Sequence, residues 1–263
     1  MFKREIKVNF KGFLIWLLVL MGLFLVVFLV YPSIVNSSNI KDMDSLMEMF
    51  PEEMLKAFNM DLSSITSAYG WLKSEGFVFV LLIIGCYSGI LGSTILLKEE
   101  NDKTIEYLNS LPIKRNDIII NKVIVGIVYI ILMTIILSIF NFIGLSCSGG
   151  FDHKQYFLLS ITPIFSSLVI FMVCMFLSTF TNKTKKMIGA SLGIVFISYV
   201  LQMLSSIADS VSWLKYLSVF TLADIRNVIM DIRINPLMVV LSIGLFILFL
   251  IFTMIRYNRK ELV

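Results

Sequence analysis

The sequence predicts an all-α membrane protein, because the chain is very apolar and its apolar residues fall into six long runs. Of the 263 residues, 58% are hydrophobic and 15% are charged, and the mean hydropathy is +0.90. Soluble globular domains carry about 25% charged residues. Each run is close to the roughly 20 apolar residues that a helix needs to cross a bilayer. The runs are residues 13–31, 76–97, 123–145, 156–180, 188–208 and 237–255.

Helices are favoured in these runs because a helix satisfies its own backbone hydrogen bonds in lipid. Strands of a membrane barrel would alternate apolar and polar residues, whereas these runs are unbroken. We therefore expect one transmembrane domain, 1–263, built from six transmembrane helices.

The basic residues are divided unequally between the two sides of such a domain. If both termini lie inside, the cytoplasmic segments hold 15 of the 22 lysines and arginines, and the outer segments hold eleven of the 18 acids. Cytoplasmic loops normally carry the excess of Lys and Arg. The sequence therefore predicts a multi-pass protein of the plasma membrane with both termini in the cytoplasm.

Residues 1–12 show the pattern of an amphipathic helix. Phe2, Ile6 and Phe10 share one helical face, and four basic residues surround the other. This pattern is typical of a helix that lies in the inner headgroup layer. A basic flank that only anchors the first span explains the residues almost equally well.

Two connections between the runs are long and partly apolar. Residues 36–75 contain apolar residues at helical spacing, and Pro51 followed by two glutamates is typical of a helix start. We expect short helices on the outer membrane surface there. Residues 209–236 are too apolar for a solvated loop, so we expect outer interfacial helices with Trp213 in the aromatic belt.

The sequence offers little chemistry, and we expect no enzyme and no catalytic, cofactor-binding or metal-binding residue. The single histidine, His153, has no second His or Cys at metal-ligand spacing. No span contains a histidine, which argues against an intramembrane protease. The chain contains no G-x-x-x-x-G-K-[ST], so it has no P-loop of its own for ATP. No acid or base lies at mid-depth in a span, which disfavours an ion-coupled carrier. The net charge of +4 reflects topology, not binding to nucleic acid.

Two of the runs carry glycines one helical turn apart. Small residues at this spacing let helix backbones approach closely. Packing within the chain explains either group alone, and a seam between two copies is the alternative. The glycines are Gly85, Gly89 and Gly92 in the second run and Gly189 and Gly193 in the fifth.

The segment 98–117 separates the second and third runs with a dense mixture of charges. Ile105, Leu108 and Leu111 form an apolar edge, and Pro112 ends the predicted helix. The charges alone predict only a solvated cytoplasmic helix. The order of residues, however, resembles the signature of ABC-2 type transporter permeases, the membrane subunits of ATP-driven exporters. The matching positions are Asp102, Thr104, Glu106, Leu108, Pro112, Arg115 and, opening the next span, Lys122.

The chain departs from this signature at two positions. Lys103 stands where the family prefers glycine, and Asp102 replaces a glutamate. The whole plan nevertheless resembles that family: six spans, inner termini, an amphipathic N-terminal helix and a sizeable first outer loop. The resemblance implies an ABC-2 type permease fold for the whole domain, 1–263.

The resemblance also implies partners. A separate cytoplasmic ABC ATPase subunit would bind ATP and Mg²⁺, and its closure would push on a coupling helix in segment 98–117. A second permease chain, identical or related, would complete the route, with the second and fifth spans as the seam. This favours the seam as the role of the glycines. The residues implied in coupling are Glu99, Glu100, Asp102, Thr104, Ile105, Glu106, Leu108, Pro112 and Arg115.

The sequence therefore predicts the permease of an ABC exporter that moves a hydrophobic or amphipathic substrate, such as a peptide, drug or lipid, outward. The alternative is a membrane-embedded immunity or assembly factor that binds a partner through the same cytoplasmic loop. An ion-driven carrier ranks third. The hypotheses differ in whether an ATPase is required.

Overall fold

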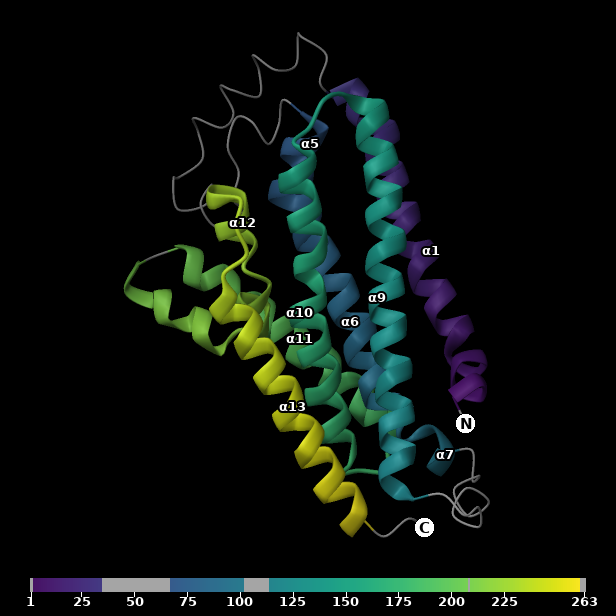
Figure 1. Ribbon diagram of the computed structural model, residues 1–263. Coiled ribbons are helices and arrows are strands. Elements are labelled where there is room, and N and C mark those ends of the chain that lie inside the picture. The colour runs from purple at the N-terminus through teal and green to yellow at the C-terminus, as the bar shows by residue number, and fades with distance from the viewer. Residues whose placement is uncertain (1, 35–66, 102–113, 208, 261–263) are drawn as a thin grey trace.

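The computed structural model describes residues 2–34, 67–101, 114–207 and 209–260 (Figure 1). Every regular element in these ranges is a helix, and six helices are long and apolar enough to cross a membrane. The predicted all-α architecture with six spans is confirmed. The spans are α1 (Phe2–Ile34), α6 (Phe77–Ile95) with the helical turns before it, α9 (Arg115–Ser148), α10 (His153–Ser178), α11 (Thr184–Ile207) and α13 (Pro236–Arg259).

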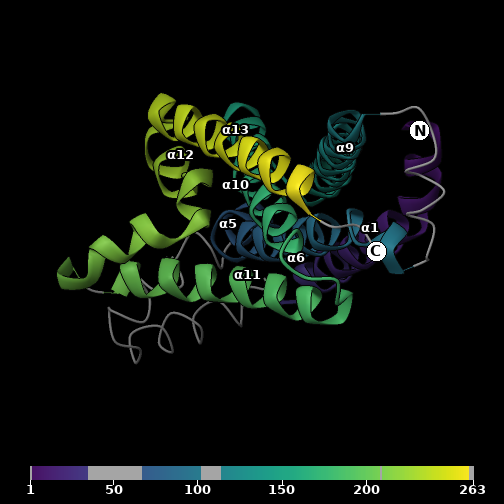
Figure 2. The ribbon, with the colours of Figure 1, turned by 90° about the horizontal axis from the view of Figure 1, so that it is seen from below.

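α6 and α10 form the centre of the bundle, and α1, α11 and α13 form its periphery. In the most apolar 18-residue window of each span, 61% of residues are buried in the second span and in α10. The corresponding share is 22% in α1 and α11 and 11% in α13. Seen from below, α11 and α13 lie on opposite sides of α10 (Figure 2). The peripheral helices thus keep broad apolar faces for lipid or for another chain.

One aromatic residue of α10 explains why the central helices approach so closely. A Cβ atom at Gly92 of α6 would lie 2.2 Å from the carbonyl oxygen of Phe171. A Cβ atom at Gly126 of α9 would lie equally close, 2.2 Å, to the ring of the same phenylalanine. Only glycine leaves room for these contacts. Phe171 therefore joins α6, α9 and α10 at the core.

The second span begins earlier than its apolar run. α5 (Ala68–Trp71) and the π-helix η1 (Leu72–Gly76) lead directly into α6. Ala68, Tyr69 and Leu72 are buried, so packing extends the helix beyond the stretch that hydropathy alone marks. The rest of the first outer loop, residues 35–66, lies outside the described residues, and so do the short helices expected there.

The connection between α11 and α13 consists of three short helices. They are η2 (Asp209–Leu217), η3 (Val219–Ala223) and α12 (Ile225–Asp231), of which η2 and η3 are 3₁₀ helices. Trp213 is 57% exposed, whereas Phe220 is 3% exposed and packs beside α6. The segment 209–236 is thus part of the fold, and its position at the membrane interface stays a prediction.

Candidate functional site

Several charged side chains meet at the end of the bundle where both chain termini lie. The N-terminus, the C-terminus and α7 (Lys98–Asn101) occupy this end in Figure 1. α9 and α11 begin there and α13 ends there. We call it the terminal end.

A buried lysine lies at the centre of the terminal end. Lys122 of α9 is 0% exposed, and Glu5 and Glu99 are 3% and 4% exposed. The Nζ atom of Lys122 lies 2.7 and 2.8 Å from the two carboxylate oxygens of Glu99 and 3.3 Å from Oε2 of Glu5. It also donates to the carbonyl oxygen of Ile95 at 2.6 Å. We call Glu5, Glu99 and Lys122 the Lys122 cluster.

The Lys122 cluster joins three segments that are far apart in the sequence. Glu5 belongs to α1, Glu99 to α7 and Lys122 to α9. An ammonium group has three donors, and the acceptors around Lys122 use all of them. Burying a charge is tolerated when it is paired and hydrogen-bonded. The cluster therefore favours one arrangement of these three segments over others.

The N-terminal part of α1 makes two further contacts at this end. The hydroxyl of Tyr129 in α9 donates to the carbonyl of Ile6. Nζ of Lys98 in α7 donates to the carbonyl of Val8 at 3.4 Å. Residues 2–12, expected as an interfacial helix, continue into the first span without a break in α1. Their position in the headgroup layer stays a prediction.

The second half of α7 contacts two other helices. The carboxylate of Glu100 lies 2.8 and 3.0 Å from Nζ of Lys260, which follows the last turn of α13. The side-chain amide of Asn101 donates to the hydroxyl of Thr184 at the start of α11. The four residues of α7 thus contact four different long helices: Lys98 contacts α1, Glu99 contacts α9, Glu100 contacts the end of α13, and Asn101 contacts α11.

Arg115, in the first turn of α9, holds the end of α13. Its Nη1 atom donates to the carbonyls of Tyr257, Asn258 and Lys260 at 3.4, 3.3 and 3.0 Å. The last carbonyls of a helix have no partner within the helix, and a cation beside them is favourable. Asn258 also donates its amide to Asn116 at 2.7 Å. The end of α13 is therefore attached to α7 and to α9.

The residues implied in coupling divide into two groups. Glu99, Glu100 and Arg115 lie together at the terminal end, each in the contacts just described. Both acids are turned inward, because their side chains are 5% and 4% exposed. They connect helices inside the chain, and their expected role in coupling stays a prediction. The other members, Asp102, Thr104, Ile105, Glu106, Leu108 and Pro112, lie outside the described residues.

Sequence reasoning did not find the partners of these acids. The sequence analysis counts Lys122 and Lys260 only as cytoplasmic basic residues, with Lys122 also in the family signature, and it assigns no role to Glu5. One signal was present: Lys122 lies between the apolar residues 118–120 and 123–125. A charge inside an apolar run requires a buried partner. The sequence did not indicate which acids that partner would be.

The glycines of the two spans have different surroundings. Gly85, Gly89 and Gly92 are buried in α6, and Cβ atoms there would meet Phe220, Ser191 and the backbone of Phe171. We therefore assign these three to packing within the chain, one of the two roles that their spacing allows. Their burial favours this role, and a place in a seam between two copies stays a prediction.

Gly189 and Gly193 of α11 are the opposite case. A Cβ atom at either position would meet nothing within 4 Å. Phe196 and Ile197 on the same helix are 54% and 62% exposed. Of the two glycine groups, only this one lies on an open face of the described structure.

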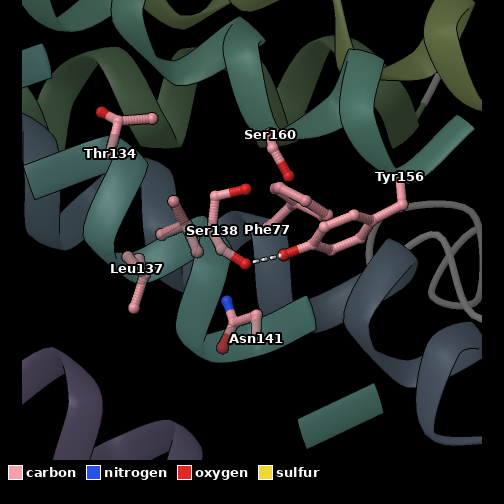
Figure 3. A pocket seen from close by; sticks show the side chains of 8 residues that line it. Phe77, Thr134, Leu137, Ser138, Asn141, Tyr156 and Ser160 are labelled. Atoms are coloured by element: carbon pink, nitrogen blue, oxygen red, sulfur yellow. Dashed lines mark hydrogen bonds between the residues drawn. The ribbon is translucent and has the colours of Figure 1, made fainter. Parts of the chain in front are cut away.

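A small polar pocket lies within the bundle between α6, α9 and α10 (Figure 3). The hydroxyl of Tyr156 donates to the carbonyl of Ser138 at 2.6 Å, and Asn141 lies beside this bond. The pocket has a volume of about 10 Å³, room for about one water molecule. It is too small for a substrate. Across the described ranges, no three His, Cys, Asp or Glu side chains are grouped to hold a metal ion.

Comparison with known proteins gives one result that covers nearly the whole chain. Residues 1–262 match the model of the ABC-2 family transporter proteins. No curated protein and no solved structure matched the chain in the same comparisons. The match spans far more than half of the sequence, and it agrees with six helices that are able to cross a membrane. The chain therefore belongs to the ABC-2 transporter family and is the membrane component of such a transporter.

Proposed function

We propose that the chain is the permease subunit of an ATP-driven exporter and moves a hydrophobic or amphipathic substrate outward. ATP and Mg²⁺ would be bound by a separate cytoplasmic ATPase subunit, since this sequence has no P-loop. The distribution of basic residues supports a cytoplasmic position for the terminal end. One observation carries the proposal: each residue of α7 contacts a different long helix.

α7 is suited to transmit a movement from the ATPase to the spans. The segment 102–113 follows it directly, so a partner that pushes on this segment moves α7. The ion pairs of Glu99 and Glu100 are shielded from water, and separating a buried pair costs about 3–5 kcal/mol. Displacing α7 therefore displaces its partner helices with it instead of breaking these contacts.

Two permease chains would enclose the route. The open face of α11 around Gly189 and Gly193 is the part of the described structure that supports such a seam, because small residues allow close helix packing there. The partner chain could be identical or related.

The experiment is co-purification of the chain with a P-loop ATPase, followed by transport and ATPase rates in proteoliposomes. Ile105→Ala and Leu108→Ala should weaken ATPase binding, because apolar anchors supply most interface affinity. Glu100→Gln should leave binding intact and lower the transport achieved per ATP hydrolysed, because α7 loses its ion pair with Lys260. Glu106→Ala should likewise uncouple hydrolysis from transport.

Lys186→Gln is the matched control, since this lysine is exposed at the same end and its side chain forms no ion pair with the described residues of α7. Wild-type transport per ATP in Glu100→Gln would contradict the role of α7. If no ATPase associates with the chain at all, the exporter hypothesis falls, and an immunity or assembly factor becomes the better interpretation.

A further inference from the structure

A large cavity lies toward the end opposite the termini. Its volume is about 760 Å³, within the range of about 300–1,000 Å³ that is typical of small-molecule sites. It is bounded by the second half of α11, by the first turns of the second span, by the η2–η3–α12 segment and by the start of α13. We call it the distal cavity.

Two carboxylates line the distal cavity without a cationic partner. Within the described ranges, Oε1 of Glu75 is buried and has no hydrogen-bond partner. Oδ2 of Asp224 is also buried, and the backbone of Asn235 interacts favourably with this carboxylate. The other oxygen of Asp224 accepts a hydrogen bond of 2.8 Å from the amide of Asn227. Neither carboxylate forms an ion pair within the described ranges. A shielded carboxylate without a partner is unfavourable, and a bound cation would relieve it.

The basic residues of the cavity do not offset these acids. Lys215 and Arg226 also line it, but both are exposed. Nζ of Lys215 lies 5.2 Å from the centre of the Tyr216 ring, which is itself 75% exposed. Long basic side chains at a rim keep their charges in water. The shielded charge of the cavity is therefore negative.

The walls of the cavity also offer apolar surface from five elements. This surface is provided by Val78, Leu81, Met203, Phe220, Ile225 and Met238. Polar side chains outnumber these apolar ones around the cavity, so the apolar residues form a patch within a largely polar lining. Polar groups fix the orientation of a ligand in such a site. A carboxylate beside such walls suits a molecule that carries one positive charge on an apolar body.

We infer that the distal cavity binds a small amphipathic cation, with Glu75 as its principal counter-ion and Asp224 as a second acidic contact. The apolar body of the ligand lies against the α6, α11 and η3 side chains. The inference rests on the proposed function in one respect, because such a molecule would be the cargo of the exporter. The binding itself needs neither ATP nor a partner subunit.

The test measures binding of tetraphenylphosphonium to the purified full chain in lipid nanodiscs, without any ATPase. Triphenylphosphine oxide, which is uncharged and of similar shape, is the matched probe. We expect the cation to bind and the uncharged probe to bind at least about tenfold more weakly, the ratio that corresponds to 1.4 kcal/mol. Glu75→Gln should weaken binding of the cation by about tenfold and leave the uncharged probe unchanged.

Two further variants make the result specific to the cavity. Asp224→Asn should weaken binding of the cation by a smaller factor, because one of its oxygens is already held by Asn227. Asp231→Asn is the control, since Asp231 is an exposed acid at the end of α12 that does not line the cavity. Its charge acts on Asp224, so this variant should weaken binding of the cation by less than Asp224→Asn does.

Equal binding of the two probes, or wild-type affinity in both Glu75→Gln and Asp224→Asn, would overturn the inference. A loss as large in Asp231→Asn would also overturn it, because the attraction would then be a property of the surface. The outcome is separable from the proposed function: cation binding that depends on Glu75 stands even if no ATPase associates. A coupled ATPase with no such binding would leave the exporter hypothesis intact and refute only the cavity.

Discussion

At the terminal end of the bundle Lys122 shares its ammonium group between Glu5 and Glu99. Near the opposite end Glu75 and Asp224 each have a buried carboxylate oxygen and form no ion pair with any described residue. Glu5, Glu75 and Glu99 lie near the ends of apolar runs, and Asp224 lies between η3 and α12 in the connection between two spans. Their difference lies in what surrounds them. The terminal end is packed, and the opposite end contains a cavity of about 760 Å³.

This difference indicates two uses of shielded charge in one membrane protein. Charges whose partners come from the same chain fix the relative positions of helices, as α7 and its contacts do. Charges that the chain leaves without a partner beside a cavity are available to a ligand. The comparison predicts opposite responses when charges are removed at the two ends.

The largest effect should follow removal of the ammonium group of Lys122. Lys122→Met leaves Glu5 and Glu99 buried together without a counter-ion, and we expect a loss of about 3–5 kcal/mol in the free energy of unfolding. Thermal unfolding of the purified chain in detergent is the measurement. Lys186→Met, at an exposed position of the same end, should change stability by less than about 0.5 kcal/mol.

A compensated variant sharpens this prediction. Lys122→Met combined with Glu5→Gln and Glu99→Gln removes all charges of the Lys122 cluster, and it should recover much of the stability, because uncharged groups of similar volume often replace a buried ion pair at little cost. If the single variant unfolds at the wild-type temperature, the cluster does not hold the terminal end together.

Glutamate-to-glutamine substitution should change the free energy of unfolding by a smaller amount, and differently at the two ends. Glu99→Gln should cost about 1.5–3 kcal/mol, the usual value of a hydrogen bond to a charged group. Glu75→Gln should leave the unfolding free energy unchanged or raise it, since it removes a shielded charge that has no partner. Denaturant or thermal unfolding of both variants tests the difference. Equal losses would show that the two acids have the same role, and the comparison would fail.

Much of the fold could be predicted from the sequence because lipid leaves few options for a long apolar run. Each such run must be helical, so the six spans followed from hydropathy alone. Packing decided what hydropathy could not. The second span starts at Ala68 because Tyr69 and Leu72 are buried against the bundle, although this part of the chain is not uniformly apolar.

The site was harder to predict because its contacts are distant in sequence. Glu5 and Lys122 are separated by 117 positions, and no local pattern links them. Spacing of small residues has the same limit: it marks helices that approach closely, but Gly92 faces Phe171 of the same chain while Gly189 faces open space. The distal cavity depends on how the η2–η3–α12 segment packs, which its composition does not specify.

The smallest effect should appear in the pH dependence of stability at Asp224. Burial raises the pKa of the Asp224 carboxyl above its ordinary value, although hydrogen bonds from the side chain of Asn227 and the backbone of Asn235 oppose this. The folded protein therefore binds this proton more tightly than the unfolded chain does. The stability that results is fully present below the ordinary pKa of about 4 and is lost as the pH rises through the folded value.

Asp224→Asn removes this titration and keeps the left-handed backbone of the residue, φ 48°, which asparagine tolerates. The variant and the wild type should therefore be closest in stability at about pH 4, and the variant should gain as the pH approaches 7. The gain should be small, because the carboxyl is partly open to solvent, which screens its charge. Thermal unfolding of both proteins between these two pH values measures it. Saturating tetraphenylphosphonium should reduce the gain, because a cation in the distal cavity stabilises the charged carboxylate. A stability difference between variant and wild type that does not change with pH would contradict the shielded state of Asp224.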